Sequence, residues 1–154
     1  MKHVQTLLLA LLFTFATLNG AARAEGTKAD AQAMVDKAAL FLKAQGRDKL
    51  LAEVNTKDGQ FHKGELYVFV YDLNATILAH PVNPGLIGKN TLEVPDVAGK
   101  FYRKEIVELA KTKGSGWVDY LYKNPSNGKT EPKTAFLQKA GDLILVAGVY
   151  KPEK

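Results

Sequence analysis

The sequence at residues 117–150, WVDYLYKNPSNGKTEPKTAFLQKAGDLILVAGVY, decides the fold. It contains three segments rich in β-branched and aromatic residues, at 117–122, 134–138 and 143–150, and each is typical of a β-strand. The segments between them carry the turn-forming residues Asn, Pro, Gly and Asp. Because both connections are short, we expect the three strands to form an antiparallel meander.

Upstream, a second group of strands is predicted around a tight turn. Residues 66–71 (LYVFVY) are β-branched and aromatic, and residues 76–79 form their partner strand. The DLNA segment at 72–75 separates them, and Asp and Asn favour turns because their side chains hydrogen-bond their own backbone. Together with the meander, this hairpin predicts five antiparallel strands.

Helices are predicted before and between these strands. Apolar residues recur at helical spacing over 31–42, a short second helix follows around Leu50, and a third helix covers 96–113. Thr27 and Asp30 form a capping signal for the first helix. The fold class is therefore α+β, with helices covering one face of a five-stranded antiparallel sheet.

Residues 1–24 have the layout of a secretory signal peptide. Lys2 precedes an apolar run at 7–18, and Ala22-Arg23-Ala24 supplies a small-residue cleavage pattern. The apolar run is shorter than the roughly 20 residues that span a bilayer, which disfavours the alternative of an uncleaved anchor. We therefore expect cleavage after Ala24, a periplasmic or secreted location, and one domain at 25–154.

Composition argues against several classes of protein. The chain has no cysteine and three histidines, so we expect no disulfide, metal centre or cofactor. Lys2 and Arg23 are two of the 21 basic residues, so the basic residues that remain after cleavage exceed the 16 acidic residues by three. This small excess, with no basic run, indicates that nucleic acid is not a partner.

Short segments spaced along the chain carry a family resemblance. They are YVFVYD at 67–72, LAHP at 78–81, GKN at 88–90, DVAGK at 96–100, GSGWVDY at 114–120, KTAF at 133–136 and AGVY at 147–150. In this order and at these intervals they resemble a single Cache domain, which is an extracytoplasmic, PAS-like sensory domain.

The resemblance implies both a fold and a function. The implied fold is a long N-terminal helix packed on a five-stranded antiparallel sheet, with a small pocket between one sheet face and its covering loops. Family members commonly bind small molecules there, often short carboxylic acids. We therefore expect a small organic acid or similar metabolite as the ligand, and a membrane sensor kinase or chemoreceptor as the signalling partner.

Strand alternation selects candidate ligand contacts. Tyr120 and Tyr122 share one face of their strand with Val118, while Trp117 is expected on the other face, against the long helix. A tyrosine combines an apolar ring with a hydroxyl group, which suits a small polar ligand. The same tyrosines could equally serve packing alone.

Other candidates come from strand ends and helices. Lys133, expected to start its strand, is the preferred cation for a carboxylate, whereas Arg103 is expected to face water. His80 either donates to the ligand or holds loop backbone. Asp96 is expected to cap the third helix or to place its amides toward the ligand. The candidate ligand-binding residues are Tyr67, His80, Asp96, Phe101, Tyr120, Tyr122, Lys133 and Phe136.

These patterns predict a ligand-binding sensory domain that is not an enzyme. One alternative is an interaction module whose pocket is filled by its own side chains and which binds a protein or forms a homodimer. A more remote alternative is a small hydrolase that uses His80 with Asp96 or Asp119, although fold and two titratable residues do not make a mechanism.

Overall fold

The computed structural model describes residues 26–150. The signal peptide predicted at residues 1–24 lies outside them. No helix within 26–150 is long and apolar enough to cross a membrane. The elements in chain order are α1 (Lys28–Gln45), α2 (Arg47–Val54), β1 (His62–Lys63), β2 (Leu66–Asp72), β3 (Ile77–Ala79), the 3-10 turn η1 (Pro84–Leu86), α3 (Tyr102–Lys113), β4 (Ser115–Lys123), β5 (Thr130–Ala140) and β6 (Leu143–Tyr150).

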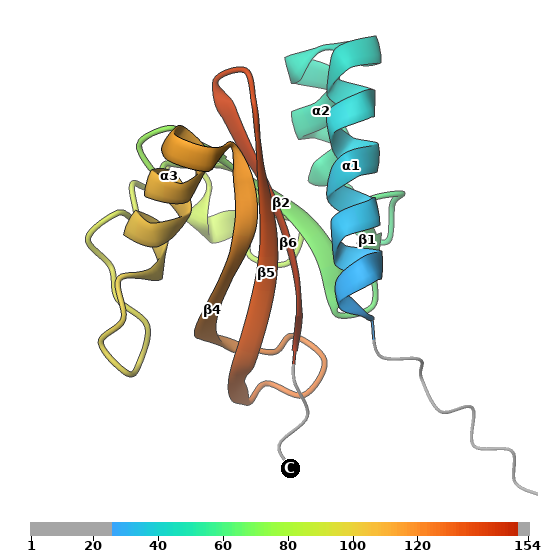
Figure 1. Ribbon diagram of the computed structural model, residues 1–154. Helices are drawn as coiled ribbons and strands as arrows, with labels where there is room; N and C mark the ends of the chain where they lie inside the picture. The colour runs from blue at the N-terminus through green and yellow to red at the C-terminus, as the bar shows by residue number, and fades with distance from the viewer. Residues whose placement is uncertain (1–25, 151–154) are drawn as a thin grey trace, which may run out of the picture.

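The strands form one antiparallel sheet in the order β1-β2-β6-β5-β4, with β3 beside β2 (Figure 1). The pairing of β4 with β5 and of β5 with β6 confirms the predicted meander, and the pairing of β2 with β3 confirms the predicted hairpin. The described sheet has six strands instead of five, because His62–Lys63, expected in a loop, pairs with β2. The central strand β6 is buried along its whole length.

Strand β5 is longer than predicted, and this changes the setting of Lys133. The strand begins at Thr130, and Pro132 lies opposite Leu121 of β4. Within the described residues, the pairing with β6 reaches Lys133 opposite Tyr150. Lys133 therefore stands inside the strand rather than at its start.

Helices α1 and α2 cover one face of the sheet (Figure 1). The Thr27 hydroxyl accepts the N–H of Asp30, and the Asp30 carboxylate accepts the N–H of Thr27, so the predicted signal forms a capping box. The apolar side of α1 packs on β5 and β6. Trp117 lies on this face as predicted, with the Lys28 amine 4.4 Å from its ring centre.

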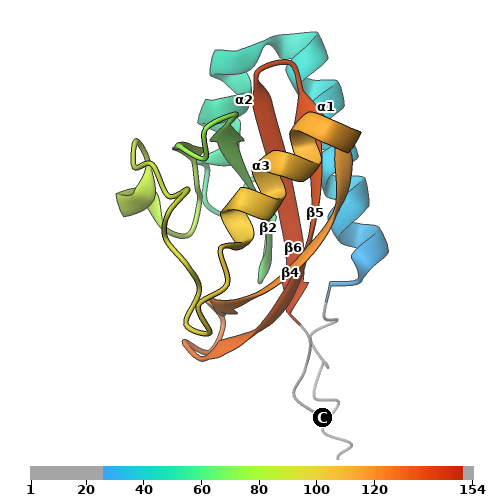
Figure 2. The same cartoon turned by 60° about the vertical axis from the view of Figure 1, so that its left-hand side comes forward.

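Helix α3 covers the opposite face, so the prediction that the helices share one face was wrong (Figure 2). The helix also begins at Tyr102, later than predicted. Asp96 Oδ1 accepts the N–H groups of Ala98 and Lys100, both at 2.9 Å, and these bonds close a tight turn. Gly99 within this turn has a φ of +85°, which a right-handed helix does not contain. The segment before α3 is therefore a turn rather than a helix.

Candidate ligand-binding site

A small cavity lies between the sheet and α3. Its walls come from β2, β3, β4 and β5, from the segment after β3 and from the first turn of α3. The empty space measures about 220 Å³, part of it open to solvent, and leaves room for little more than a water molecule. The lining residues are Tyr67, Phe69, Tyr71, Ile77, His80, Tyr102, Arg103, Tyr120, Tyr122 and Lys133.

Lys133 places a titratable amine inside this cavity. The residue is 1% exposed. Its Nζ donates to the Tyr67 hydroxyl at 3.1 Å and to the Tyr150 hydroxyl at 3.4 Å. No ion pair of the described residues involves Lys133. Burial lowers the pKa of Lys133 from 10.5 to about 7, and the charge of Glu65 opposes this shift only in part.

Gly148 on β6 provides the space for the Lys133 side chain. A Cβ at this position would lie 2.8 Å from Lys133 Cε and 2.9 Å from Ala135 Cβ, closer than carbon atoms pack. Because that carbon is missing, the lysine stem rests against the β6 backbone and its amine reaches Tyr67. The glycine in the AGVY segment thus has a steric role in the site.

His80 is a neutral donor whose ring is fixed by backbone. Its Nδ1 accepts the Asn83 N–H at 3.0 Å, so the proton resides on Nε2. Burial, with the charges of Lys133 and Arg103, lowers the pKa of His80 to about 3. The ring stacks on Phe69 with centroids 5.4 Å apart. His80 therefore holds loop backbone through one nitrogen and keeps an N–H donor at the cavity.

Arg103 also lines the cavity, which corrects the expectation that it faces water. It is 6% exposed, and its Nη1 donates to the Val94 carbonyl at 2.8 Å. Its guanidinium carbon lies 4.3 Å from the Tyr102 ring centre. Its buried Nε has no hydrogen-bond partner among the described residues. Because α3 begins at Tyr102, Arg103 lies in the first turn and is directed inward.

Tyrosines supply most of the remaining wall. Tyr120 and Tyr122 both face the cavity, in agreement with the predicted alternation. Tyr120 stacks on Tyr102 of α3 with centroids 3.9 Å apart and planes 3° from parallel. Burial raises the pKa of Tyr67, Tyr120 and Tyr122, so these hydroxyls stay protonated at neutral pH and can donate hydrogen bonds.

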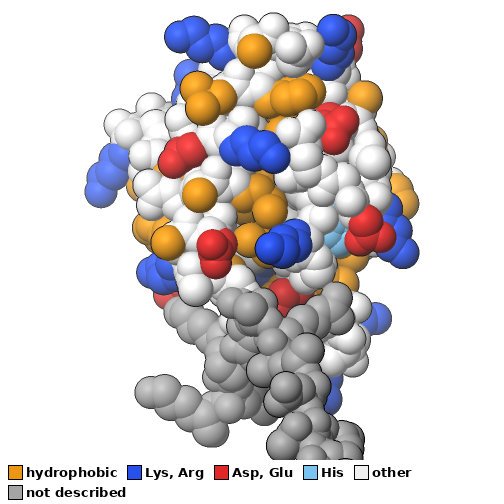
Figure 3. All heavy atoms as spheres, turned by 90° about the vertical axis from the view of Figure 1, so that its right-hand side faces the viewer, with side chains coloured by type: hydrophobic (Ala, Val, Ile, Leu, Met, Phe, Trp, Pro, Cys, Tyr) orange, Lys and Arg blue, Asp and Glu red, His pale blue; other side chains and the backbone are white. Residues whose placement is uncertain are grey.

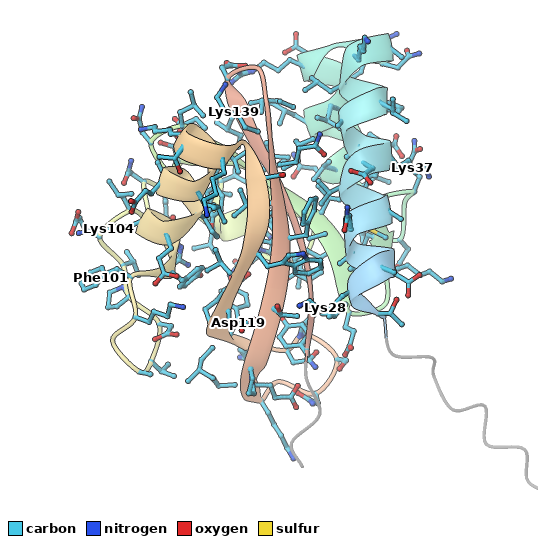
Figure 4. All side chains as sticks on the ribbon, in the orientation of Figure 1. Lys28, Lys37, Phe101, Lys104, Asp119 and Lys139 are labelled. Atoms are coloured by element: carbon cyan, nitrogen blue, oxygen red, sulfur yellow. The ribbon has the colours of Figure 1, made fainter. Side chains whose placement is uncertain are left out.

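Three of the predicted contacts lie away from the cavity, and we remove them from the candidate set. Phe101 is 42% exposed at the edge of the molecule, near Lys104 (Figure 4). Phe136 packs on Trp117 on the α1 side, because strand alternation places it opposite Lys133. Asp96 accepts the Leu121 N–H at 3.0 Å and so ties its turn to β4.

Sequence reasoning missed Tyr71, Tyr102 and Ile77 as lining residues. Tyr71 carried a usable signal, because alternation along β2 places it on the same face as Tyr67. Tyr102 could be assigned only once the start of α3 was known. Ile77 belongs to a strand too short to show a clear alternation.

The arrangement is suited to an anion. Lys133 and Arg103 bring two basic groups to the cavity, and His80 and the tyrosines add neutral donors. None of the described residues that line it is Asp or Glu. The hydrogen bonds of His80 and Asp96 described above go to different backbone groups, and no bond between the two side chains is seen. This weakens the form of the hydrolase alternative that pairs His80 with Asp96.

Comparison with known proteins agrees with this architecture. A sequence model described as "Cache domain" matches residues 26–153. The chain belongs to the Cache domain family. This Cache domain is 30% identical over 86 residues to the methyl-accepting chemotaxis protein McpP of Pseudomonas putida, which covers 54% of this chain. The match covers 16% of McpP, so the chain spans only a small part of that relative.

Solved structures extend the comparison to the fold. A periplasmic sensor domain of a chemotaxis protein is 25% identical with a TM-score of 0.65, covering 79% of this chain and 88% of that one. A Cache chemosensory domain described for carboxylic acid recognition is 25% identical with a TM-score of 0.63, over 79% and 86% of the two chains. A methyl-accepting chemotaxis protein from Vibrio parahaemolyticus, at 17% identity and a TM-score of 0.70 over 80% and 87%, shares the fold. Two of these solved structures are described as sensor or chemosensory domains.

Proposed function

We propose that this Cache domain is a periplasmic sensory domain that binds a small carboxylate and passes the binding event to a partner protein. The partner is a membrane chemoreceptor or sensor kinase. The buried Lys133 amine carries the carboxylate assignment, because no acidic side chain of the described residues pairs with it. Burying a charge without a counter-charge costs free energy, and a carboxylate ligand would supply that counter-charge.

The other lining residues suit the rest of such a ligand. Charge-assisted hydrogen bonds from Lys133 and Arg103 are about twice as strong as neutral ones, and the His80 Nε2–H adds a third donor. Phe69 and Ile77 offer apolar surface for a short hydrocarbon end. Support also comes from the solved Cache domain described for carboxylic acid recognition.

The narrow cavity requires some opening when a ligand enters. One wall is a continuous sheet packed against α1, whereas the other wall is α3 and the segment after β3. Backbone hydrogen bonds tie residues 88–91 of that segment to residues 75–77. Helix α3 contacts the sheet through side-chain packing, so α3 is the part of this wall that can move. A carboxylate would bind and stabilise the more open conformation.

A thermal-shift screen with short carboxylates, amino acids and amines tests this function. A carboxylate at one hundred times its dissociation constant should stabilise the wild type by about 2.7 kcal/mol. Lys133→Met should abolish the shift, and Tyr120→Phe, which keeps the stacked ring but removes the hydroxyl, should reduce it. Lys139→Ala is the matched control, because Lys139 lies exposed near the other end of β5 (Figure 4). A folded wild type that no acid stabilises would contradict the proposal.

The narrow cavity also favours a second candidate, an interaction module without a ligand. The surface offers hydrophobic side chains for such contacts: Leu40 on α1 is 69% exposed, and Val97 before α3 is 78% exposed. On the α1 side, hydrophobic groups lie among charges of both signs (Figure 3). This candidate predicts self-association in analytical ultracentrifugation that Leu40→Glu abolishes, together with a flat ligand screen.

A further inference from the structure

Four aromatic rings surround the Lys133 amine and form what we call the Lys133 cage. They come from three different strands, β2, β4 and β6, so the cage exists only in the folded sheet. The Nζ atom lies 4.3 Å from the ring centre of Tyr67, 4.6 Å from that of Tyr150, 5.5 Å from that of Tyr122 and 5.6 Å from that of Phe69.

All four distances fall within the roughly 6 Å over which an aromatic face attracts a cation. Cages of this kind recognise ammonium groups on ligands, because the negative faces of the rings replace the lost hydration. The hydroxyls of Tyr67 and Tyr150 accept hydrogen bonds from the same nitrogen. The cage thus has the features of an ammonium-binding site, and its occupant is part of the chain.

We propose that the Lys133 cage is a cation site that the chain fills with its own lysine, and that this occupancy sets the cavity for anions and excludes amine-bearing ligands such as α-amino acids. Lys133 is then the specificity-determining residue. The exclusion of amine-bearing ligands deepens the proposed function and rests on it. The presence of the aromatic cage around Lys133 does not depend on that function.

The charges around the cage support this exclusion. A second ammonium group entering the cavity would meet Lys133 and Arg103 and would find no Asp or Glu among the described lining residues. The acid whose charge acts on Lys133 is Glu65, which does not line the cavity. An amine ligand would therefore be desolvated beside like charges without a counter-ion, which is unfavourable.

Removing the Lys133 side chain should convert the cage into a binding site for a free ammonium ligand. Lys133→Ala deletes three carbons and the amine beyond Cβ, and n-propylammonium has the same atoms. We expect n-propylammonium at ten times its dissociation constant to raise the melting temperature of Lys133→Ala by about 4 °C or more. The wild type, whose cage is filled, should show no shift with n-propylammonium or glycine.

Matched controls separate the cage from simple cavity filling. Lys133→Met fills the cage with an apolar chain of similar length and should not respond to n-propylammonium, and the surface variant Lys139→Ala should behave as the wild type. 1-Propanol has the shape of the amine without its charge. A Lys133→Ala protein that 1-propanol stabilises as strongly as the amine, or that neither stabilises, would overturn the cation site.

Two further results keep the proposal falsifiable if Lys133→Ala does not fold. In wild-type protein labelled at lysine Cε, ring currents in the cage should shift one lysine methylene signal upfield, and Lys133→Met should lack that signal. Absence of the shifted signal from folded wild type would refute the cage. Stabilisation of the wild type by glycine would refute the exclusion of amino acids but leave the cage standing. A wild type that binds no carboxylate would contradict only the proposed function.

Discussion

The amine of Lys133 combines a charge suited to an anion with burial that disfavours the charge. The unfolded chain keeps the Lys133 proton up to the ordinary pKa of 10.5, whereas the folded chain releases it near 7. Between these values the unfolded state binds more protons, so stability should increase as pH rises. Relative to Lys133→Met, the wild type should gain about 2 kcal/mol between pH 7 and pH 9 in urea unfolding. Parallel pH profiles of the two proteins would contradict this expectation.

Ligand binding should couple to the same proton. A bound carboxylate favours the ammonium form of Lys133, so binding above pH 7 should be accompanied by proton uptake and the affinity should fall by up to about tenfold per pH unit. Titration calorimetry at pH 8 in two buffers of different ionisation enthalpy measures this uptake. Identical heats in the two buffers would show that Lys133 does not change its protonation state on binding.

At the scale of single residues, the sequence identified many of the residues that line the cavity but not what surrounds them. Tyr120 was selected from strand alternation, and Lys133 and His80 from their expected places at strand ends; all three line the cavity. The burial of Lys133 could not be predicted, because it depends on the missing side chain of a glycine in a neighbouring strand. Such a contact between strands leaves no local pattern.

That glycine, Gly148, shows how one strand, β6, determines the position of a side chain on its neighbour β5. Gly148→Ala should cost about 1–3 kcal/mol through overpacking, because its Cβ would meet Lys133 Cε and the Thr134 carbonyl oxygen, both at 2.8 Å. Gly85→Ala is the matched control: its φ is not left-handed and the nearest atom to its Cβ lies at an ordinary 3.7 Å. Urea unfolding measures both variants, and equal stabilities would show that β6 has room for the added carbon.

Most elements could be predicted because their signals are local. The capping box at Thr27, the hairpin turn after Asp72 and the meander all depend on neighbouring residues. Two boundaries failed for identifiable reasons. Asp96 was taken as a helix start, but its carboxylate closes a turn and also reaches β4. The start of β5 was placed after Pro132, but pairing with β4 extends the strand back to Thr130, and such pairing is a tertiary property.

At the scale of the whole molecule, the sheet separates two packed layers. One hydrophobic cluster lies with α1 and α2, and the other lies with α3 around the cavity. Which face a helix covers depends on how the chain crosses the sheet, and this crossing has no signature in a single sequence. The separation also predicts which parts respond to a ligand.

Hydrogen exchange should show this division. The cavity can widen by movement of α3, so a carboxylate should slow amide exchange most at residues 102–113. The buried strand β6 should be highly protected with or without ligand. Mass spectrometry of proteolytic fragments resolves these regions. Protection confined to α1 would contradict this account of opening.

The position of Trp117 gives the protein a built-in optical reporter. It is the sole tryptophan of the chain, and it lies on the α1 side, behind the sheet as seen from the cavity. A ligand that fills the cavity does not touch this indole. A change in its fluorescence at saturating ligand would therefore show that ligand binding alters the packing on the α1 side of the sheet. Unchanged emission would show that the ligand binds without altering that side.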